Sequence, residues 1–176
     1  MDASPWEFKS PSEHNNFLKK QEKPKIVLFD SYIKTVKNSI GSNLFRNFYC
    51  KIGSKTVDVL EDGNLSCAKF VSSILYLFKL ISDMHTTVSG TVADLQKSGW
   101  IQTAKPRVGT VIVWEAKKVK NGNFHKHIGF YIGNKRVISS SYEKHQPIVH
   151  HWTYGTKNSK PVRKVEQIFW NKSLIK

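Results

Sequence analysis

The sequence is poor in cysteine and arginine, and it has no long apolar run. Its 176 residues include only Cys50 and Cys67, too few for the disulfide framework of a small secreted domain. The most apolar stretch, residues 70–78, is far shorter than the ~20 residues that span a bilayer, so we expect no membrane span. Residues 1–20 lack the apolar core of a secretory signal. We therefore expect synthesis in the cytosol, and any action outside the cell would need a non-classical export route.

Acidic residues are also scarce, with 13 Asp+Glu against 28 Lys+Arg and a formal charge of +15. Residues 115–176 alone hold +10, which suggests a polyanionic partner such as nucleic acid, an anionic cell wall or a membrane surface. Only four of the basic residues are arginines, whereas base-edge and bidentate phosphate recognition depends on the planar guanidinium. The lysine-rich charge favours loose attraction to an anionic polymer over sequence-specific DNA binding.

The chain divides into a short arm and one domain. Residues 1–24 are polar, contain three prolines and show no apolar period, so we expect an extended arm. Residues 25–176 are long enough for a single packed core. Apolar spacing predicts helices at residues 26–40, 66–82 and 92–98. A hairpin is expected at residues 44–61, and strands at residues 109–114, 127–132, 136–140, 147–154 and 165–170. Helices followed by antiparallel strands predict an α+β fold.

Cys67 is the first candidate for chemistry. It is expected in the first turn of the 66–82 helix, with Ser66 as the N-cap. The helix dipole and unpaired N–H groups there favour the thiolate, and the same N–H groups can stabilise an oxyanion. A cysteine on an apolar helix face also fits plain core packing, so position alone leaves both interpretations open. Cys50 lies in an apolar strand and is interpreted as a core residue.

Five of the seven histidines lie between residues 125 and 151. A thiol nucleophile requires an imidazole within reach and a third polar group that fixes its tautomer. His127 begins a strand in which His127, Gly129 and Tyr131 share one face. Gly129 is expected to leave room there for a substrate backbone. His127 is therefore the candidate base, the alternative being a polar strand-end residue without a role.

Three segments carry a resemblance. Residues 64–71 (NLSCAKFV), 107–114 (RVGTVIVW) and 127–134 (HIGFYIGN) resemble, in order, the nucleophile helix, the first core strand and the histidine strand of the NlpC-type cell-wall cysteine peptidases. The resemblance implies a papain-like α+β fold, with N-terminal helices packed on an antiparallel sheet. It also implies no metal or other cofactor, and hydrolysis of amide bonds in peptidoglycan stem peptides. Cys67 would be the nucleophile and His127 the base.

The chain departs from the family at several positions. Ser66 and Ala68–Lys69 flank the cysteine where Asp and Ser-Gly are usual, and Thr110 stands where an Asp is usual. The third catalytic position aligns with Ser139, whose hydroxyl orients an imidazolium less well than His, Asn or Asp. These replacements leave a catalytically inactive member of the fold as an open alternative.

A histidine of the next strand offers a substitute for the third residue. If the hairpin turns near residues 144–145, paired residue numbers sum to 289 and Ser139 faces His150. We predict that His150 orients His127, directly or through Ser139. A register slip of one residue would give this role to His151. The alternative is that these histidines only face substrate or support the strand.

Zinc is a competing interpretation of the histidines. His125 and His127 project from one strand face, and the 147–154 strand can add a ligand. However, no carboxylate or cysteine lies at ligand spacing except Glu143, and zinc would leave the position of Cys67 unexplained. We therefore expect no metal.

The sequence thus predicts a monomeric cysteine peptidase or amidase, with Cys67, His127 and His150 as catalytic residues and peptidoglycan or its peptide fragments as partner. One alternative is a thiol amidase or acyltransferase acting on a non-wall substrate. The other is an inactive basic module that binds cell wall or nucleic acid. The Cys–His pair is compatible with each enzymatic version, because all of them attack a carbonyl carbon with a thiolate.

Overall fold

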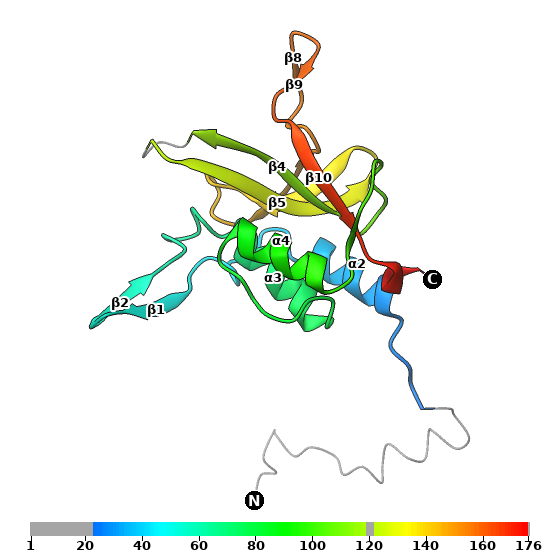
Figure 1. Ribbon diagram of the computed structural model, residues 1–176, viewed down its shortest axis with the longest axis horizontal. Coiled ribbons are helices and arrows are strands. Elements are labelled where there is room, and N and C mark those ends of the chain that lie inside the picture. Colours follow the sequence, from blue (N-terminus) through cyan, green and yellow to red (C-terminus); the bar gives the residue numbers. More distant parts are fainter. Residues whose placement is uncertain (1–22, 119–121, 176) are drawn as a thin grey trace, which may run out of the picture.

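A computed structural model describes residues 23–118 and 122–175 (Figure 1). The expected arm at residues 1–24 lies outside the described residues except for its last two. The helices are α2 (Leu28–Asn38), α3 (Cys67–Leu77) and α4 (Val88–Lys97), with a short 3₁₀ helix at Lys172–Leu174. The strands are β1 (Tyr49–Ile52), β2 (Lys55–Asp58), β3 (Ile101–Gln102), β4 (Val111–Lys118), β5 (Phe124–Gly133), β6 (Arg136–Ser140), β7 (Pro147–His151), β8 (Thr156–Lys157), β9 (Lys160–Pro161) and β10 (Val165–Trp170).

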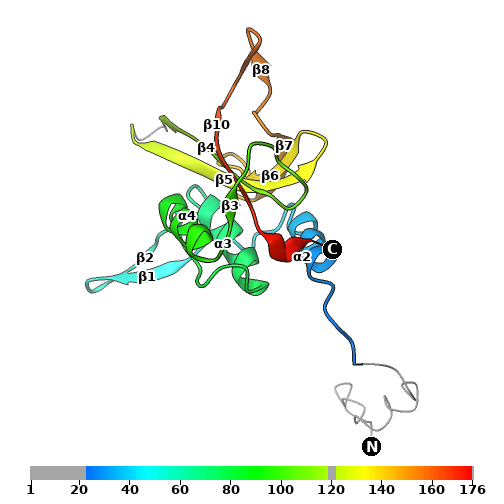
Figure 2. The ribbon, with the colours of Figure 1, turned by 45° about the vertical axis from the view of Figure 1, so that its right-hand side comes forward.

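Six strands form one antiparallel sheet in the order β3-β10-β4-β5-β6-β7. The helices gather on one face of this sheet, and α3 packs directly on β5 and β6 (Figures 1 and 2). In Figure 1 the β8–β9 hairpin projects at the top, beyond the sheet, and the β1–β2 hairpin projects at the left, beside the helices. The α+β class expected from the order of helices and strands is confirmed. No helix within residues 23–118 and 122–175 is long and apolar enough to cross a membrane.

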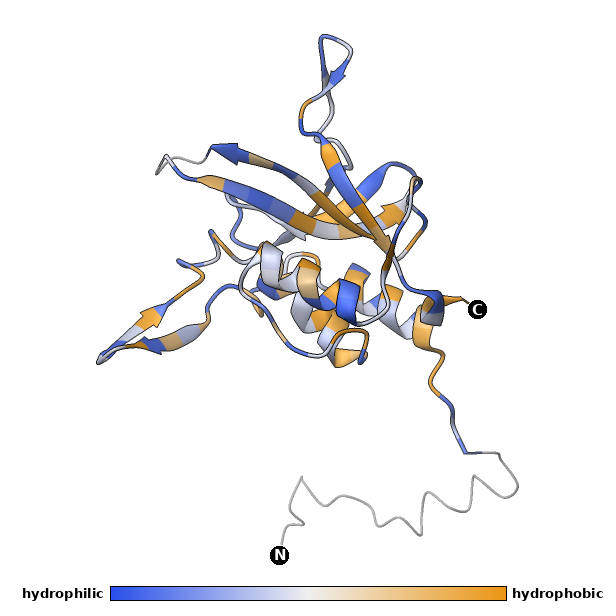
Figure 3. Cartoon of the chain, viewed as in Figure 1, coloured by the Kyte–Doolittle hydropathy of each residue, from blue (hydrophilic) through white to orange (hydrophobic). Residues whose placement is uncertain are grey.

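The core lies between α3 and the sheet, where the apolar side chains of both layers meet (Figure 3). Phe70, Val71 and Leu75 of α3 are fully buried. Phe70 makes edge-to-face contact with Phe130 of β5, with ring centroids 5.4 Å apart. Each such side chain stabilises the fold by roughly 1.5–3 kcal/mol through burial. The packing fixes the start of α3, and with it Cys67, against β5.

All three helices differ from the expected ranges: α2 is shorter by two residues at each end, and the other two differ by four residues or more at one end. α3 ends at Leu77 rather than near residue 82, because Lys79 turns left-handed and the Leu80 N–H donates to the Leu75 carbonyl. α4 begins at Val88, four residues before the expected start, because the Thr87 hydroxyl caps it by accepting from the Gly90 N–H at 3.1 Å. The strand expected at residues 165–170 has those bounds.

Candidate active site

Cys67 is the first residue of α3 and lies at the wall of a cavity. Ser66 does not cap the helix as expected. Its hydroxyl instead donates to the Gly63 carbonyl at 2.8 Å. Burial raises the pKa of the Cys67 thiol above its usual value, although the N–H groups of Ile128 and Ala68 favour the thiolate. The expectation of a preformed thiolate therefore gives way to a protonated thiol lying against the backbone of β5.

A chain of hydrogen bonds links three neighbouring strands beside this thiol. His127 Nε2 on β5 lies 2.8 Å from Ser139 Oγ on β6, and Ser139 Oγ lies 2.7 Å from His150 Nε2 on β7. His150 Nδ1 lies 2.9 Å from the His151 carbonyl. The structure thus joins two of the sequence-predicted residues, His127 and His150, through the third-position Ser139.

The outermost hydrogen bond, from His150 to the His151 carbonyl, fixes which group donates and which accepts along the whole chain. A carbonyl only accepts, so His150 Nδ1 carries a proton and its Nε2 accepts from the Ser139 hydroxyl. The Ser139 oxygen then accepts from His127 Nε2–H. His127 Nδ1 consequently carries no proton and is the nitrogen that can take one from a thiol.

The strand register differs from the expected one by two residues. Ser139 pairs with Ile148, and Val137 pairs with His150, so paired numbers sum to 287. The cause is the turn: the Ser141 hydroxyl accepts from the N–H groups at residues 143 and 144, which centres the reversal there. A shift of two leaves His150 on the face of Ser139, diagonal to it. His151 instead lies within hydrogen-bond distance of Thr153 and Gly155 in the following turn.

Aromatic rings enclose the two imidazoles. The His127 and His150 rings lie 5.5 Å and 5.7 Å from the Trp114 ring, and His150 stacks on Tyr154 at 4.1 Å. Burial, followed by the charges of Arg163 and His150, lowers the pKa of His127 to about 3. Burial also lowers the pKa of His150. Both imidazoles are therefore neutral at neutral pH.

Gly129 has a different purpose from the one expected. A Cβ at this position would lie 2.6 Å from the Ile138 carbonyl oxygen and 2.7 Å from Ser139 Cβ. It would also meet the Trp114 ring at 3.2 Å. The space above Gly129 is therefore filled by protein, and the glycine allows β6 to approach closely enough for Ser139 to reach His127.

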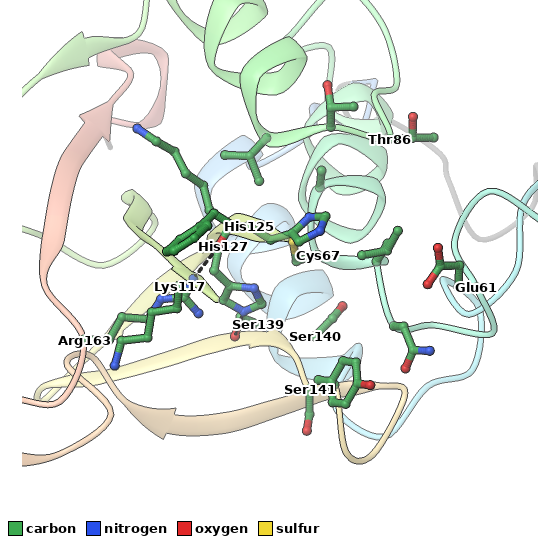
Figure 4. A pocket seen from close by; sticks show the side chains of 18 of the residues that line it. Glu61, Cys67, Thr86, Lys117, His125, His127, Ser139, Ser140, Ser141 and Arg163 are labelled. Carbon is green, nitrogen blue, oxygen red and sulfur yellow. Dashed lines mark hydrogen bonds between the residues drawn. The ribbon is translucent and has the colours of Figure 1, made fainter. Parts of the chain in front are cut away.

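The cavity beside Cys67 has a volume of about 890 Å³, large enough for a short peptide. Figure 4 shows Cys67 beside the labelled histidines of β5, with Arg163 and Lys117 on one side and Glu61 on the other. His125 also lines the cavity, and its Nε2 is buried without a hydrogen-bond partner. The charged residues that line the cavity are Glu61, Lys117, Lys126, Glu143 and Arg163.

Three residues of this site were not identified from the sequence: Trp114, Tyr154 and Arg163. Arg163 reaches the site from the β9–β10 connection, where its guanidinium donates to the Glu115 and His125 carbonyls. The sequence offered one signal for a special role of Arg163: arginine is rare in this lysine-rich chain, which has only four. Tyr154 follows the predicted last histidines but offered no such signal.

No metal site is formed by the described residues. Within residues 23–118 and 122–175, no three His, Cys, Asp or Glu side chains converge to hold a metal ion. His127 Nε2 is already hydrogen-bonded to Ser139. Both cysteines are free thiols.

Comparison with models of known protein families gives no match, and comparison with curated protein sequences gives none either. The resemblance to NlpC-type peptidases therefore rests on the three short segments described above. In the structure these segments form the start of α3, the strand β4 with the residues before it, and β5 with its following turn. The chemistry of the site is the remaining guide to function.

Proposed function

We propose that the protein is a cysteine hydrolase of papain-like, NlpC-type fold that cleaves amide bonds in peptidoglycan stem peptides. One observation carries the proposal: a hydrogen-bond chain through Ser139 and His150 leaves His127 Nδ1 unprotonated in the cavity that the helix-terminal thiol of Cys67 also lines. The substrate class comes from the resemblance and from the positive charge.

The first half of the reaction forms a thioester. The Cys67 S–H proton moves to His127 Nδ1 as the sulfur attacks the amide carbonyl carbon, and a C–S bond forms. The C–N bond then breaks as His127 returns the proton to the departing amine nitrogen. Water subsequently attacks the thioester, loses a proton to His127, and releases a carboxylic acid. His127 finally returns that proton to the sulfur.

Neutral resting groups are compatible with this mechanism. The pKa of His127 is low and that of Cys67 is high while both are uncharged and partly buried. Proton transfer converts them into an adjacent ion pair, and each new charge then stabilises the other. The Ser139–His150 chain accepts from His127 Nε2–H throughout and so stabilises the imidazolium.

The oxyanion would lie at the start of α3. The backbone N–H groups of Cys67 and Ala68 point toward the sulfur, as their stabilisation of the thiolate indicates. Such N–H groups at a helix N-terminus also stabilise the charge of a tetrahedral intermediate. Because the Ser66 hydroxyl binds the Gly63 carbonyl and does not cap α3, it does not occupy the first N–H groups of the helix, where the substrate oxyanion would bind.

A digestion experiment tests the proposal. Purified peptidoglycan and its soluble fragments are incubated with the full chain, and products are identified by mass spectrometry. We expect cleavage within the stem peptide by the wild type and by the control C50A, and none by C67A. Absence of any product, or equal product from C67A, would overturn the proposal. Cleavage of other amides or transfer of the acyl group would instead identify a thiol amidase or acyltransferase.

A further inference from the structure

We propose that Arg163 forms a carboxylate-binding subsite in the cavity and binds a free carboxylate of the substrate next to the scissile amide. This inference rests on the proposed hydrolase function, to which it adds a specificity residue. Its first support is the way in which the guanidinium is held. Nε and Nη2 donate to the Glu115 carbonyl at 3.1 and 2.9 Å, and Nη2 also donates to the His125 carbonyl at 2.9 Å.

These three bonds orient the cation without neutralising it. The acceptors of these three bonds are backbone carbonyls, and the Tyr154 side chain, a further hydrogen-bond partner, is a neutral phenol. None of the ion pairs among residues 23–118 and 122–175 includes Arg163. Lys126, another cation at the cavity, is by contrast paired with Glu166 at 2.7 Å. A half-buried, oriented guanidinium without a counter-ion is suited to bind a carboxylate from outside the chain.

The position of Arg163 relates this charge to the reacting groups. Its guanidinium lies 5.9 Å from the Tyr154 ring, which stacks on His150. Its positive charge also reaches Cys67 and His127, because it favours the thiolate and disfavours the imidazolium. A carboxylate bound here would therefore lie near the scissile bond. It would also partly cancel the positive charge that keeps His127 from accepting a proton.

The opposite side of the cavity has the opposite charge. Glu61 lies there, whereas Arg163 and Lys117 lie on the other side (Figure 4), and Glu143 also lines the cavity. Coulomb attraction and repulsion both direct a substrate carboxylate away from the glutamates and toward Arg163. The cavity thus favours one orientation of a charged peptide across Cys67.

The experiment is a titration of the ¹⁵N-labelled full chain, following the Arg163 Nε–H signal at constant ionic strength. The probes are N-acetylglycine and its neutral isostere N-acetylglycinamide. We expect a saturable shift with the carboxylate and at least ~10-fold weaker binding of the amide, typical of a lost charge-assisted hydrogen bond. Equal binding of both probes, or no shift with either, would overturn the subsite.

Variants assign the effect to the side chain, with protein amide signals as the readout. R163M should weaken N-acetylglycine binding at least ~10-fold and leave the amide unaffected. K160M removes one positive charge from the exposed β9 and should bind as the wild type does. Equal weakening by both variants would indicate general attraction and contradict the subsite. If R163M does not fold, the comparison of the two probes on the wild type still decides.

Binding and hydrolysis can fail separately. Carboxylate-selective binding in a chain that cleaves nothing would leave the subsite intact and remove the proposed function. Cleavage of stem peptides by a chain that binds both probes equally would support the proposed function and remove the subsite.

Discussion

His127 depends on a serine that the sequence places in an unpromising position. A lone hydroxyl at residue 139 would orient an imidazolium poorly, but Ser139 is 1% exposed and lies between two imidazoles. Its hydroxyl donates to His150 Nε2, which strengthens it as an acceptor for His127 Nε2–H. The two-residue unit of Ser139 and His150 therefore occupies the place that one polar side chain usually fills.

The first prediction concerns this unit. S139A should lower kcat for peptidoglycan fragments by roughly 10–100-fold, with KM nearly unchanged, because the lost hydrogen bond matters mainly when His127 is protonated. H150A should have a similar effect, and the double variant should be no worse than either single one. Steady-state kinetics measures both constants. H151A is the matched control, and additive losses in the double variant would contradict the action of Ser139 and His150 as one hydrogen-bonded unit.

The second prediction concerns pH. The pKa of His127 is about 3 in the folded chain and near 6.5 when unfolded, so the unfolded chain binds a proton first as pH falls. His127 is therefore neutral in both states above about pH 6.5, and it destabilises the fold progressively as pH falls from there toward 3. We expect the free energy of unfolding in urea to fall by about 2–3 kcal/mol between pH 6.5 and 4 from this residue.

The variant H127Q separates His127 from other titrating groups. It has no proton to gain in this range, so its unfolding free energy should depend less steeply on pH than that of the wild type. An unchanged slope would mean that His127 is not buried in its neutral form.

At the scale of elements, the spacing of apolar residues predicted which side chains are buried better than it predicted where helices begin and end. The predicted helix at 66–82 overran α3, because Leu80 and Ile81 are buried although they lie beyond the helix. The start of α4 was missed, because its first turn is polar and contains Gly90. The β6–β7 register was missed by two, because it depends on how the Ser141 hydroxyl binds the turn. Polar contacts of this kind leave little trace in hydrophobic periodicity.

The third prediction tests the close approach of two strands. G129A places a Cβ 2.6 Å from the Ile138 carbonyl oxygen, so β5 and β6 must separate. We expect a loss of about 2–4 kcal/mol of stability and of most activity, because Ser139 moves away from His127. Urea denaturation and the kinetic assay measure the two effects. G99A is the control: a Cβ there meets no atom within 4 Å, and it should cost only about 1 kcal/mol because of its positive φ.

At the scale of the whole molecule, the order of residues along the chain indicated a cysteine–histidine pair, but it did not predict all the residues that surround the pair. A helix-start cysteine followed by a strand histidine indicated the pair of Cys67 and His127. Arg163 was not identified, because its place at the site depends on a connection that folds back across β4 and β5. Contacts made across such a sequence distance have no local pattern.

The fourth prediction concerns the uneven charge. Lys157, Lys160 and Lys164 are exposed on and next to the projecting β8–β9 hairpin, whose base leads to Arg163 (Figure 1). If they attract an anionic wall polymer, their joint replacement by glutamine should weaken sedimentation with insoluble peptidoglycan and flatten its salt dependence. The same change at three exposed lysines elsewhere (51, 55 and 79) is the control. Equal effects would indicate net charge alone, and salt-steep retention on DNA would favour a nucleic-acid partner.

The central claim is that Cys67 and His127 act together as nucleophile and base. The most direct test measures kcat/KM for stem-peptide hydrolysis in chains that each lack one group: C67A, H127A and the control C50A. We expect C50A to match the wild type, and C67A and H127A each to fall at least ~1,000-fold, with the double variant no worse than either. If C67A keeps more than about a tenth of the wild-type value, the protein does not work by this mechanism.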